Sequence, residues 1–192
     1  MTNYRQIRYF QTDNHPEERM IQSFITETYN SVPSKQCLMP YAIHVFGPKH
    51  VNEKEELFKA TQSRDVDVNT LINYQIFASY VLLFTSRWCN TPNDWVKILI
   101  DHGHEHMACD PEKYQDDRKG PSIEIGMFCS QLTNLCLNAN LDVAYTACLP
   151  KRVLDIDEDV YLAMSIGYAD NDRYKNNPKQ YKPKIDEVIY WP

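Results

Sequence analysis

Residues 122–141 read SIEIGMFCSQLTNLCLNANL, which is the strongest helical pattern in the chain. Its large apolar residues follow one another at steps of three and four, which is the spacing of one face of an α-helix. They are Ile125, Phe128, Leu132, Leu135 and Ala139. An apolar face about five turns long belongs in a core or at a subunit interface. We therefore expect this helix to pack against the same helix of a second copy in a dimer, or to lie close to that helix.

Helices and strands alternate around this long helix. Other helices are predicted over residues 17–30, 53–61 and 93–102, and strands over 41–46, 76–85, 143–149, 161–167 and 186–191. Residues 110–120 and 173–184 are predicted to be loops. The run 76–85, IFASYVLLFT, is almost continuously apolar, as in a strand buried on both faces. This order predicts an α+β sheet between layers of helices, in a single domain that spans residues 1–192.

The composition limits the classes of function. The chain carries 20 Lys and Arg against 26 Asp and Glu, a formal net charge of −6, and it has no long basic run. It therefore lacks the concentrated positive face that nucleic acid requires. No apolar run reaches the ~18 residues that span a bilayer, and the first residues lack the apolar core of a secretory signal. We expect a cytoplasmic protein with neither a nucleic-acid nor a membrane partner and with reduced cysteines.

Motif inspection excludes several kinds of enzyme. The chain contains no GxxxxGK[ST], no GxGxxG and no GxSxG, which argues against P-loop, Rossmann and α/β-hydrolase sites. Residues 102–106 read HGHEH, but alternate histidines converge on a metal only along an extended segment. Because no second ligand cluster accompanies them, a solvent-exposed polar loop is favoured over a metal site.

Two basic pairs stand near the two ends of the chain. Arg5 and Arg8 are three residues apart, and Lys182 and Lys184 are two apart. Either pair alone is typical of a solvated surface. Together they would suit one phosphate group, since Arg offers bidentate donors and Lys a point charge.

Five segments together resemble the nitroreductase family of FMN-dependent oxidoreductases, and they occur in the family's order. YRQIRYF at 4–10 resembles RRSxRxF, and VPSKQCLMPYAIHVFGP at 32–48 resembles PSxxNxQPWxFxVV. The long helix resembles the family's central helix. SIGYADND at 165–172 resembles the IGYP segment, and KPKIDEVIYW at 182–191 resembles a basic residue followed by EVVxW.

The resemblance implies an α+β sandwich with a mostly antiparallel central sheet and a homodimer formed through the long helix. It implies FMN at the subunit interface, and hydride transfer from NADH or NADPH to a small acceptor such as a nitroaromatic or a quinone. The flavin performs this chemistry, so no catalytic side chain and no metal is implied. The implied cofactor-binding residues are Arg5, Gln6, Arg8, Pro33, Ser34, Lys35, Cys37, Asn69, Cys148, Leu149, Lys182 and Lys184, with Asn73 as an alternative to Asn69.

The chain also departs from the family pattern. Cys37 replaces an asparagine and Met39 a glutamine, and both are weak hydrogen-bonding residues. Pro150, which has no N–H, lies in the stretch 147–150 that matches the family's backbone donor to the flavin. A degenerate flavin-binding or interaction protein without turnover therefore remains the alternative.

Two interpretations of Cys37 stay open. It is either a tolerated replacement that packs by the flavin ring, or a redox thiol. For the second, Lys35 on an extended segment would point the same way and lower the pKa of the thiol.

Overall fold

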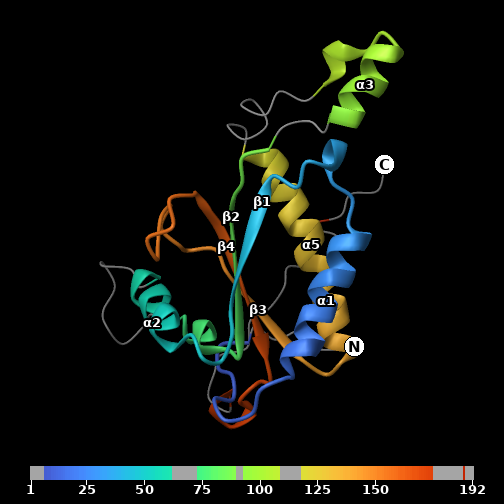
Figure 1. Ribbon diagram of the computed structural model, residues 1–192. Coiled ribbons are helices and arrows are strands. Elements are labelled where there is room, and N and C mark those ends of the chain that lie inside the picture. The colour runs from blue at the N-terminus through green and yellow to red at the C-terminus, as the bar shows by residue number, and fades with distance from the viewer. Residues whose placement is uncertain (1–6, 62–72, 90–92, 109–117, 175–187, 189–192) are drawn as a thin grey trace.

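The computed structural model describes residues 7–61, 73–89, 93–108, 118–174 and 188. A four-stranded sheet lies at its centre, in the order β1-β2-β4-β3 (Figure 1). The strands are β1 (Tyr41–Phe46), β2 (Tyr80–Ser86), β3 (Asp142–Thr146) and β4 (Val160–Gly167). Each neighbouring pair is antiparallel. The predicted α+β class with a mostly antiparallel central sheet is thus confirmed.

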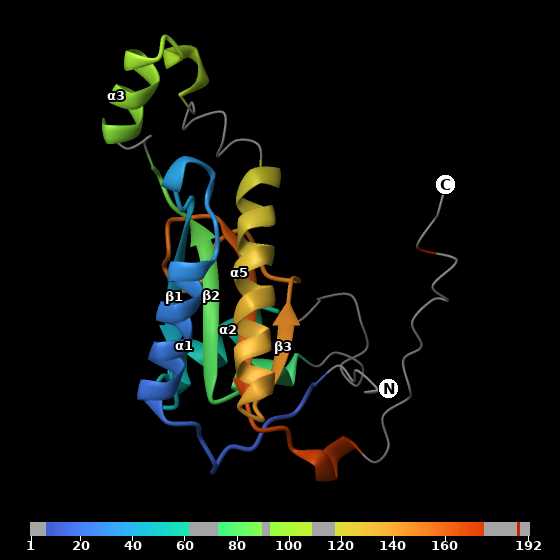
Figure 2. The same ribbon diagram turned by 90° about the vertical axis from the view of Figure 1, so that its right-hand side faces the viewer.

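Helices cover both faces of this sheet. The α-helices are α1 (Glu18–Ser31), α2 (Val51–Ala60), α3 (Asn93–Asp101) and α5 (Lys119–Asn138). Short 3₁₀ turns are η1 (Lys35–Cys37), η2 (Tyr74–Phe77), η3 (Glu105–Met107) and η4 (Asn171–Tyr174). Helices α1 and α5 lie side by side on one face and α2 lies on the other, while α3 stands away from the sheet (Figures 1 and 2). No helix among these residues is long and apolar enough to cross a membrane.

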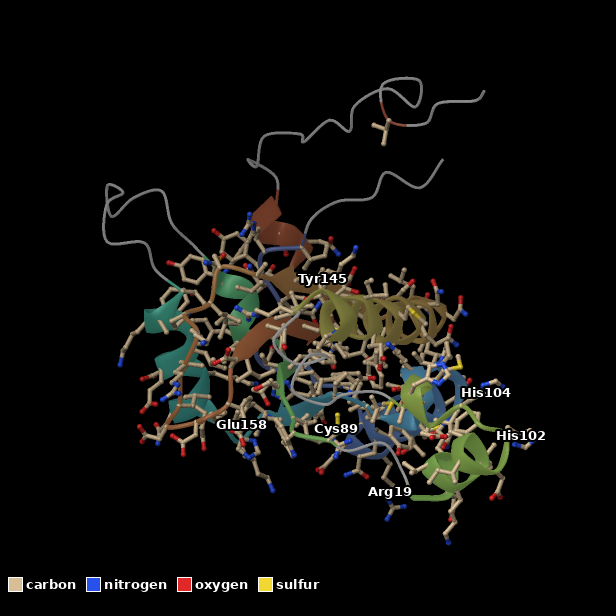
Figure 3. The ribbon with its side chains drawn as sticks, turned by 90° about the horizontal axis from the view of Figure 1, so that it is seen from above. Arg19, Cys89, His102, His104, Tyr145 and Glu158 are labelled. Carbon is tan, nitrogen blue, oxygen red and sulfur yellow. The ribbon has the colours of Figure 1, made fainter. Side chains whose placement is uncertain are left out.

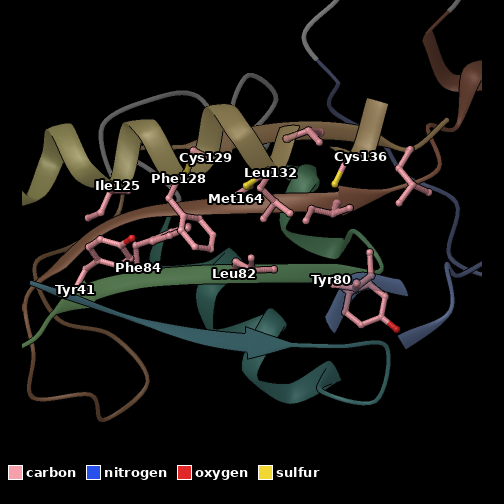
Figure 4. Close-up of a cluster of buried hydrophobic side chains, with 14 residues drawn as sticks. Tyr41, Tyr80, Leu82, Phe84, Ile125, Phe128, Cys129, Leu132, Cys136 and Met164 are labelled. Carbon is pink, nitrogen blue, oxygen red and sulfur yellow. The ribbon is translucent and has the colours of Figure 1, made fainter. Parts of the chain in front are cut away.

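The apolar stripe of α5 packs on the chain's own sheet. Phe128 and Leu132 are fully buried, and Ile125 is 2% exposed. They contact side chains of β2 and β4, among them Phe84 and Met164, in the main core (Figure 4). The stripe therefore lies in the chain's own core, one of the two places expected for it, and the packing of α5 against a second copy stays a prediction. A contact between copies would have to use the opposite face of α5.

The opposite face of α5 is itself partly apolar. Ile123, Met127 and Leu137 are exposed there, at steps that keep them on one side of the helix. We call these three residues the outer face of α5.

Strand β2 is one of the two inner strands and is buried on both sides, as its composition predicts. Leu82 and Phe84 enter the core under α1 and α5, whereas Val81 and Leu83 enter a second cluster with Leu57 of α2. The strand begins at Tyr80, not at residue 76, because the preceding residues form η2. Strand β3 likewise ends at Thr146 and not at residue 149, since its ladder with β4 ends there.

Other predicted boundaries differ by a few residues. Helix α5 starts at Lys119, so the end of the predicted loop 110–120 is helical. Pro121 fits this first turn because the N–H that proline lacks has no helical acceptor there. The predicted terminal strand 186–191 lies outside the described residues except for Val188. Most of the predicted loop 173–184 also lies outside them.

Candidate functional site

The N-terminal segment lies against the end of β4. The Gln11 N–H donates to the Tyr168 carbonyl at 2.8 Å, and the Asp170 N–H donates to the Tyr9 carbonyl at 2.9 Å. This pairing brings Arg8 beside η2. Its Nη1 donates to Oδ1 of Asn73 across 3.3 Å, between residues 65 positions apart.

Asn73 uses both ends of its side-chain amide. Its Nδ2 donates to the Thr61 carbonyl at 3.1 Å and to Sγ of Cys148 at 3.2 Å. Its Oδ1 accepts from Arg8 and, at 3.1 Å, from Nε2 of Gln75. The same Gln75 nitrogen donates to Oγ1 of Thr146 at 3.0 Å. Asn73 thereby links the N-terminal segment, the end of α2 and the end of β3.

We call Arg8, Asn73, Gln75, Thr146 and Cys148 the Asn73 cluster. Asn73, Gln75 and Thr146 are buried, whereas Cys148 is exposed. The five side chains include one cation, two amides and no carboxylate. Such a set suits an anionic ligand that also carries hydrogen-bonding groups.

The backbone after β3 adds donors next to the cluster. Neither the Cys148 N–H nor the Leu149 N–H donates to any backbone carbonyl within the described ranges. Pro150, which follows them, has no N–H to offer. The stretch 147–150 thus presents two candidate donors, at Cys148 and Leu149.

A second group of predicted residues lies at the other end of the sheet. Segment 33–39 leads into β1 and η2 precedes β2, and these strands are antiparallel. In Figure 2, η1 accordingly lies beside the first turns of α5. There the Lys35 N–H donates to Oε1 of Glu124 at 3.0 Å, and Oγ of Ser34 accepts the Met39 N–H at 2.8 Å.

The backbone of segment 33–39 is strained. Gln36, Cys37 and Met39 have φ angles of 51°, 57° and 46°, in the left-handed region that few side chains favour. The residues from 35 to 37 form a 3₁₀ turn with left-handed members, not an extended segment. The extended geometry that the redox-thiol interpretation of Cys37 requires of Lys35 is therefore absent from segment 33–39.

Side chains of Arg87 and Gln36 help to hold this strained backbone. Arg87 donates from Nε to the Met39 carbonyl at 2.8 Å and from Nη2 to the Leu38 carbonyl. Gln36 donates from Nε2 to the Met107 carbonyl at 2.7 Å. The segment is thus connected to both the end of β2 and the region of α3.

Comparison with solved structures identifies the fold. No family model and no curated protein matches the sequence. Among solved structures, a candidate NAD(P)H:FMN oxidoreductase from Staphylococcus epidermidis superposes with a TM-score of 0.69 at 15% identity, covering 99% of this chain and 92% of that one. A nitroreductase-like protein from Streptococcus mutans gives 0.64 at 16% identity, with 99% and 95% covered. Nitroreductase A from Vibrio parahaemolyticus gives 0.65 at 14% identity, with 99% and 72% covered.

The chain has the nitroreductase fold. The resemblance drawn from the five sequence segments is thereby confirmed for the fold. The motif residues of this nitroreductase fold are only partly described: Arg5, Gln6, Asn69, Lys182 and Lys184 lie outside the described residues.

Within the nitroreductase fold, the structure brings Arg8 and Cys148 together around Asn73 and keeps segment 33–39 apart from them. Of the two asparagines weighed, Asn73 occupies this central place. Sequence reasoning missed Gln75 and Thr146. Their only signal was a polar side chain inside an otherwise apolar run, which does not show that the two side chains meet.

The histidine segment belongs to neither group, although Met107, which follows it, accepts a hydrogen bond from Gln36 of segment 33–39. Residues 102–106 are exposed, and Figure 3 shows His102 and His104 at the edge of the molecule with α3. The rings of His104 and His106 pack edge to face with centroids 6.1 Å apart. In the part of the chain that the structure describes, no group of three or more potential ligands is arranged to hold a metal.

Proposed function

We propose that this chain is a cytoplasmic, FMN-dependent oxidoreductase that transfers hydride from NADH or NADPH to a small acceptor such as a nitroaromatic or a quinone. The nitroreductase fold supports the class of protein. The observation that carries the proposal is the Asn73 cluster, which joins Arg8 of the N-terminal motif to Cys148 beyond β3. The sequence resemblance places flavin contacts in both segments.

The donor set fits FMN. Arg8 would bind the phosphate through charge-assisted hydrogen bonds, and Asn73 orients its guanidinium. The N–H of Cys148 or Leu149 would donate to the flavin ring. Oε1 of Gln75 is buried with no hydrogen-bond partner among the described residues, and it would accept from a ligand hydroxyl or N–H. When bound, FMN supplies the hydride chemistry; the protein binds and orients it.

Arg5, Gln6, Asn69, Lys182 and Lys184 are proposed as further contacts to the same flavin. Among them, Arg5, Lys182 and Lys184 would add positive charge for the phosphate. This part of the proposal rests on the sequence resemblance alone.

The place of the second group supports a proposal that the chain forms a homodimer. Pro33, Ser34, Lys35 and Cys37 lie at the sheet end opposite η2, so we propose that they reach the flavin held by a second copy. A shallow hollow beside them is lined by Ile123, Met127 and Glu124 of α5. The outer face of α5 is therefore the proposed contact between the copies.

A flavin-binding protein without turnover is the second candidate. The departures at Cys37, Met39 and Pro150 favour it, because each removes or weakens a hydrogen-bonding group that the family pattern provides.

Steady-state kinetics separate the two candidates. The purified protein, loaded with FMN, is assayed for NADH and NADPH oxidation with p-benzoquinone and with nitrofurazone as acceptors. The oxidoreductase should give parallel double-reciprocal lines, since the flavin is reduced and reoxidised in separate steps. Bound FMN with no acceptor-dependent oxidation of either nucleotide would instead support a flavin-binding protein without turnover.

A further inference from the structure

Two tyrosines accompany the two residues that form the proposed phosphate site. Tyr9 directly follows Arg8, and Tyr74 directly follows Asn73. The Tyr9 and Tyr74 rings stack with centroids 5.3 Å apart and planes 30° apart. The same two segments are therefore joined twice, once by the Arg8–Asn73 hydrogen bond and once by the ring pair.

The ring pair belongs to a longer array. Tyr74 also stacks on Phe58 of α2 at 5.3 Å and 19°, and Phe58 packs against Phe77 at 4.9 Å. On the Tyr9 ring, the guanidinium carbon of Arg173 lies 5.6 Å from the centroid. We call Tyr9, Tyr74, Phe58 and Phe77 the aromatic stack.

The aromatic stack holds the residue that follows Arg8 and the residue that follows Asn73. The Tyr9 carbonyl accepts from the Asp170 N–H, and its ring is held by Tyr74. Arg173 contacts both Asp170 and Tyr9. Its Nε pairs with the Asp170 carboxylate at 3.2 Å, and its guanidinium lies over the Tyr9 ring. Tyr74 in turn sits on α2, whose Thr61 carbonyl accepts from Asn73.

Burial alone does not account for these rings. Tyr74 is 37% exposed and Tyr9 is only partly buried, so both lie at the surface of the fold. A long side chain such as Arg loses rotamer freedom when it binds a ligand, and preorganisation reduces that cost.

We propose that the Tyr9–Tyr74 pair is a positioning element that holds Arg8 in place for the phosphate of FMN. The inference rests on the proposed function. Tyr9 and Tyr74, which have no assigned contact to the flavin, would then set the part of the FMN affinity that depends on the phosphate.

Riboflavin provides the decisive comparison, because it is FMN without the phosphate. Dissociation constants for FMN and riboflavin are measured by flavin fluorescence with the full chain, Tyr74→Leu, Tyr9→Leu and Tyr74→Phe. Tyr74→Leu and Tyr9→Leu should weaken FMN binding roughly two- to ten-fold and leave riboflavin binding unchanged. Tyr74→Phe keeps the ring and should retain the wild-type preference for FMN. Because each tyrosine acts through the same pair, the double variant should lose no more than either single one.

Two results would overturn the inference. Equal weakening of both flavins in Tyr74→Leu and Tyr9→Leu would show a general structural role, and unchanged FMN binding in both would show none. Wild-type protein that binds neither flavin would instead contradict the proposed function itself. Urea unfolding of each variant checks that the folded state is being measured.

Discussion

The side-chain nitrogen of Asn73 lies 3.2 Å from the sulfur of Cys148, which joins two segments 75 residues apart. One segment precedes the inner strand β2, and the other follows the edge strand β3. Because Arg8 bonds to the other end of the same amide, one buried side chain sets the relative placement of the proposed phosphate and ring contacts.

Replacement of Asn73 by Leu should destabilise the protein. The Leu side chain leaves the buried Thr61 carbonyl and the Gln75 amide without their bonds to residue 73. Each buried group left unsatisfied costs about 1–3 kcal/mol. Urea unfolding should therefore show a loss of at least ~1 kcal/mol, whereas Asn52→Leu, at an exposed position of α2, should stay within ~0.5 kcal/mol of wild type. A similar stability for the two variants would remove Asn73 from its central role.

Arg8→Ala should weaken FMN binding more than riboflavin binding. A charge-assisted hydrogen bond to phosphate contributes ~1.5–3 kcal/mol, which corresponds to roughly ten- to a hundred-fold in the dissociation constant for FMN. Arg19→Ala, an exposed arginine of α1, is the matched control and should bind FMN like wild type. Equal FMN affinity for Arg8→Ala and wild type would exclude Arg8 from the site.

The outer face of α5 should be the dimer contact. Ile123 is 54% exposed, and obligate dimers bury more than ~2,000 Å² of largely apolar surface. Light scattering after size exclusion should give about twice the chain mass of 22.6 kDa for wild type. Ile123→Asp should shift the protein toward one chain mass, and Val51→Asp, on the other side of the sheet, should not. A wild-type monomer at micromolar concentration would contradict the proposed dimer.

Cys37→Asn should stabilise the protein slightly. Cys37 has a φ of 57°, and asparagine adopts the left-handed region more readily than other residues with a side chain. The expected gain is on the order of 0.5 kcal/mol, with NAD(P)H oxidation retained within a few-fold. Cys37→Ala, which offers no such preference, should show no gain. If Cys37→Asn and Cys37→Ser both abolish turnover while FMN stays bound, the thiol takes part in the chemistry.

Lys54 should make stability depend on alkaline pH. It is 5% exposed, and its Nζ donates to the carbonyls of Ala78 and Ser79 at 2.7 and 2.9 Å. Burial lowers the pKa of Lys54 from 10.5 to about 8. Between these values the unfolded chain holds a proton that the folded chain has released, so the free energy of unfolding rises with pH. Below pH 8 both states hold the proton, and this slope vanishes.

A Lys54→Met variant isolates this effect. The difference in the free energy of unfolding between wild type and Lys54→Met should move in favour of wild type by about 1–2 kcal/mol from pH 8 to 9.5. Urea titrations at the two pH values measure it. A difference that does not change with pH would show that the pKa of Lys54 is not lowered.

Local sequence signals predicted the regular elements well. Strand β1 matches its predicted bounds, and α1 is displaced by one residue, because Pro16, Pro33 and Pro48 mark the ends of these elements in the sequence. The exposure of the outer face of α5 was not predicted. An apolar stripe shows that one face of a helix is covered, but it does not show what covers that face. The fold itself was recognised from five weak segments in a consistent order.

The candidate site was less predictable because its contacts are long-range. Gln75 and Thr146 meet only through the docking of η2 on β3, which no local pattern encodes. The left-handed φ of Cys37 was equally hidden, since cysteine gives no sign of that conformation. Replacement of the family's asparagine by Cys37 was visible in the sequence, but its backbone consequence required the structure.

The most direct measurement is an anaerobic absorbance titration of the purified, FMN-loaded protein with NADH and NADPH. This titration tests whether the chain binds FMN and whether a nicotinamide nucleotide reduces it. We expect a flavin absorbance band that stays with the protein through size exclusion and bleaches with about one equivalent of at least one nucleotide. A protein that retains no flavin, or a bound flavin that neither nucleotide bleaches, would contradict it.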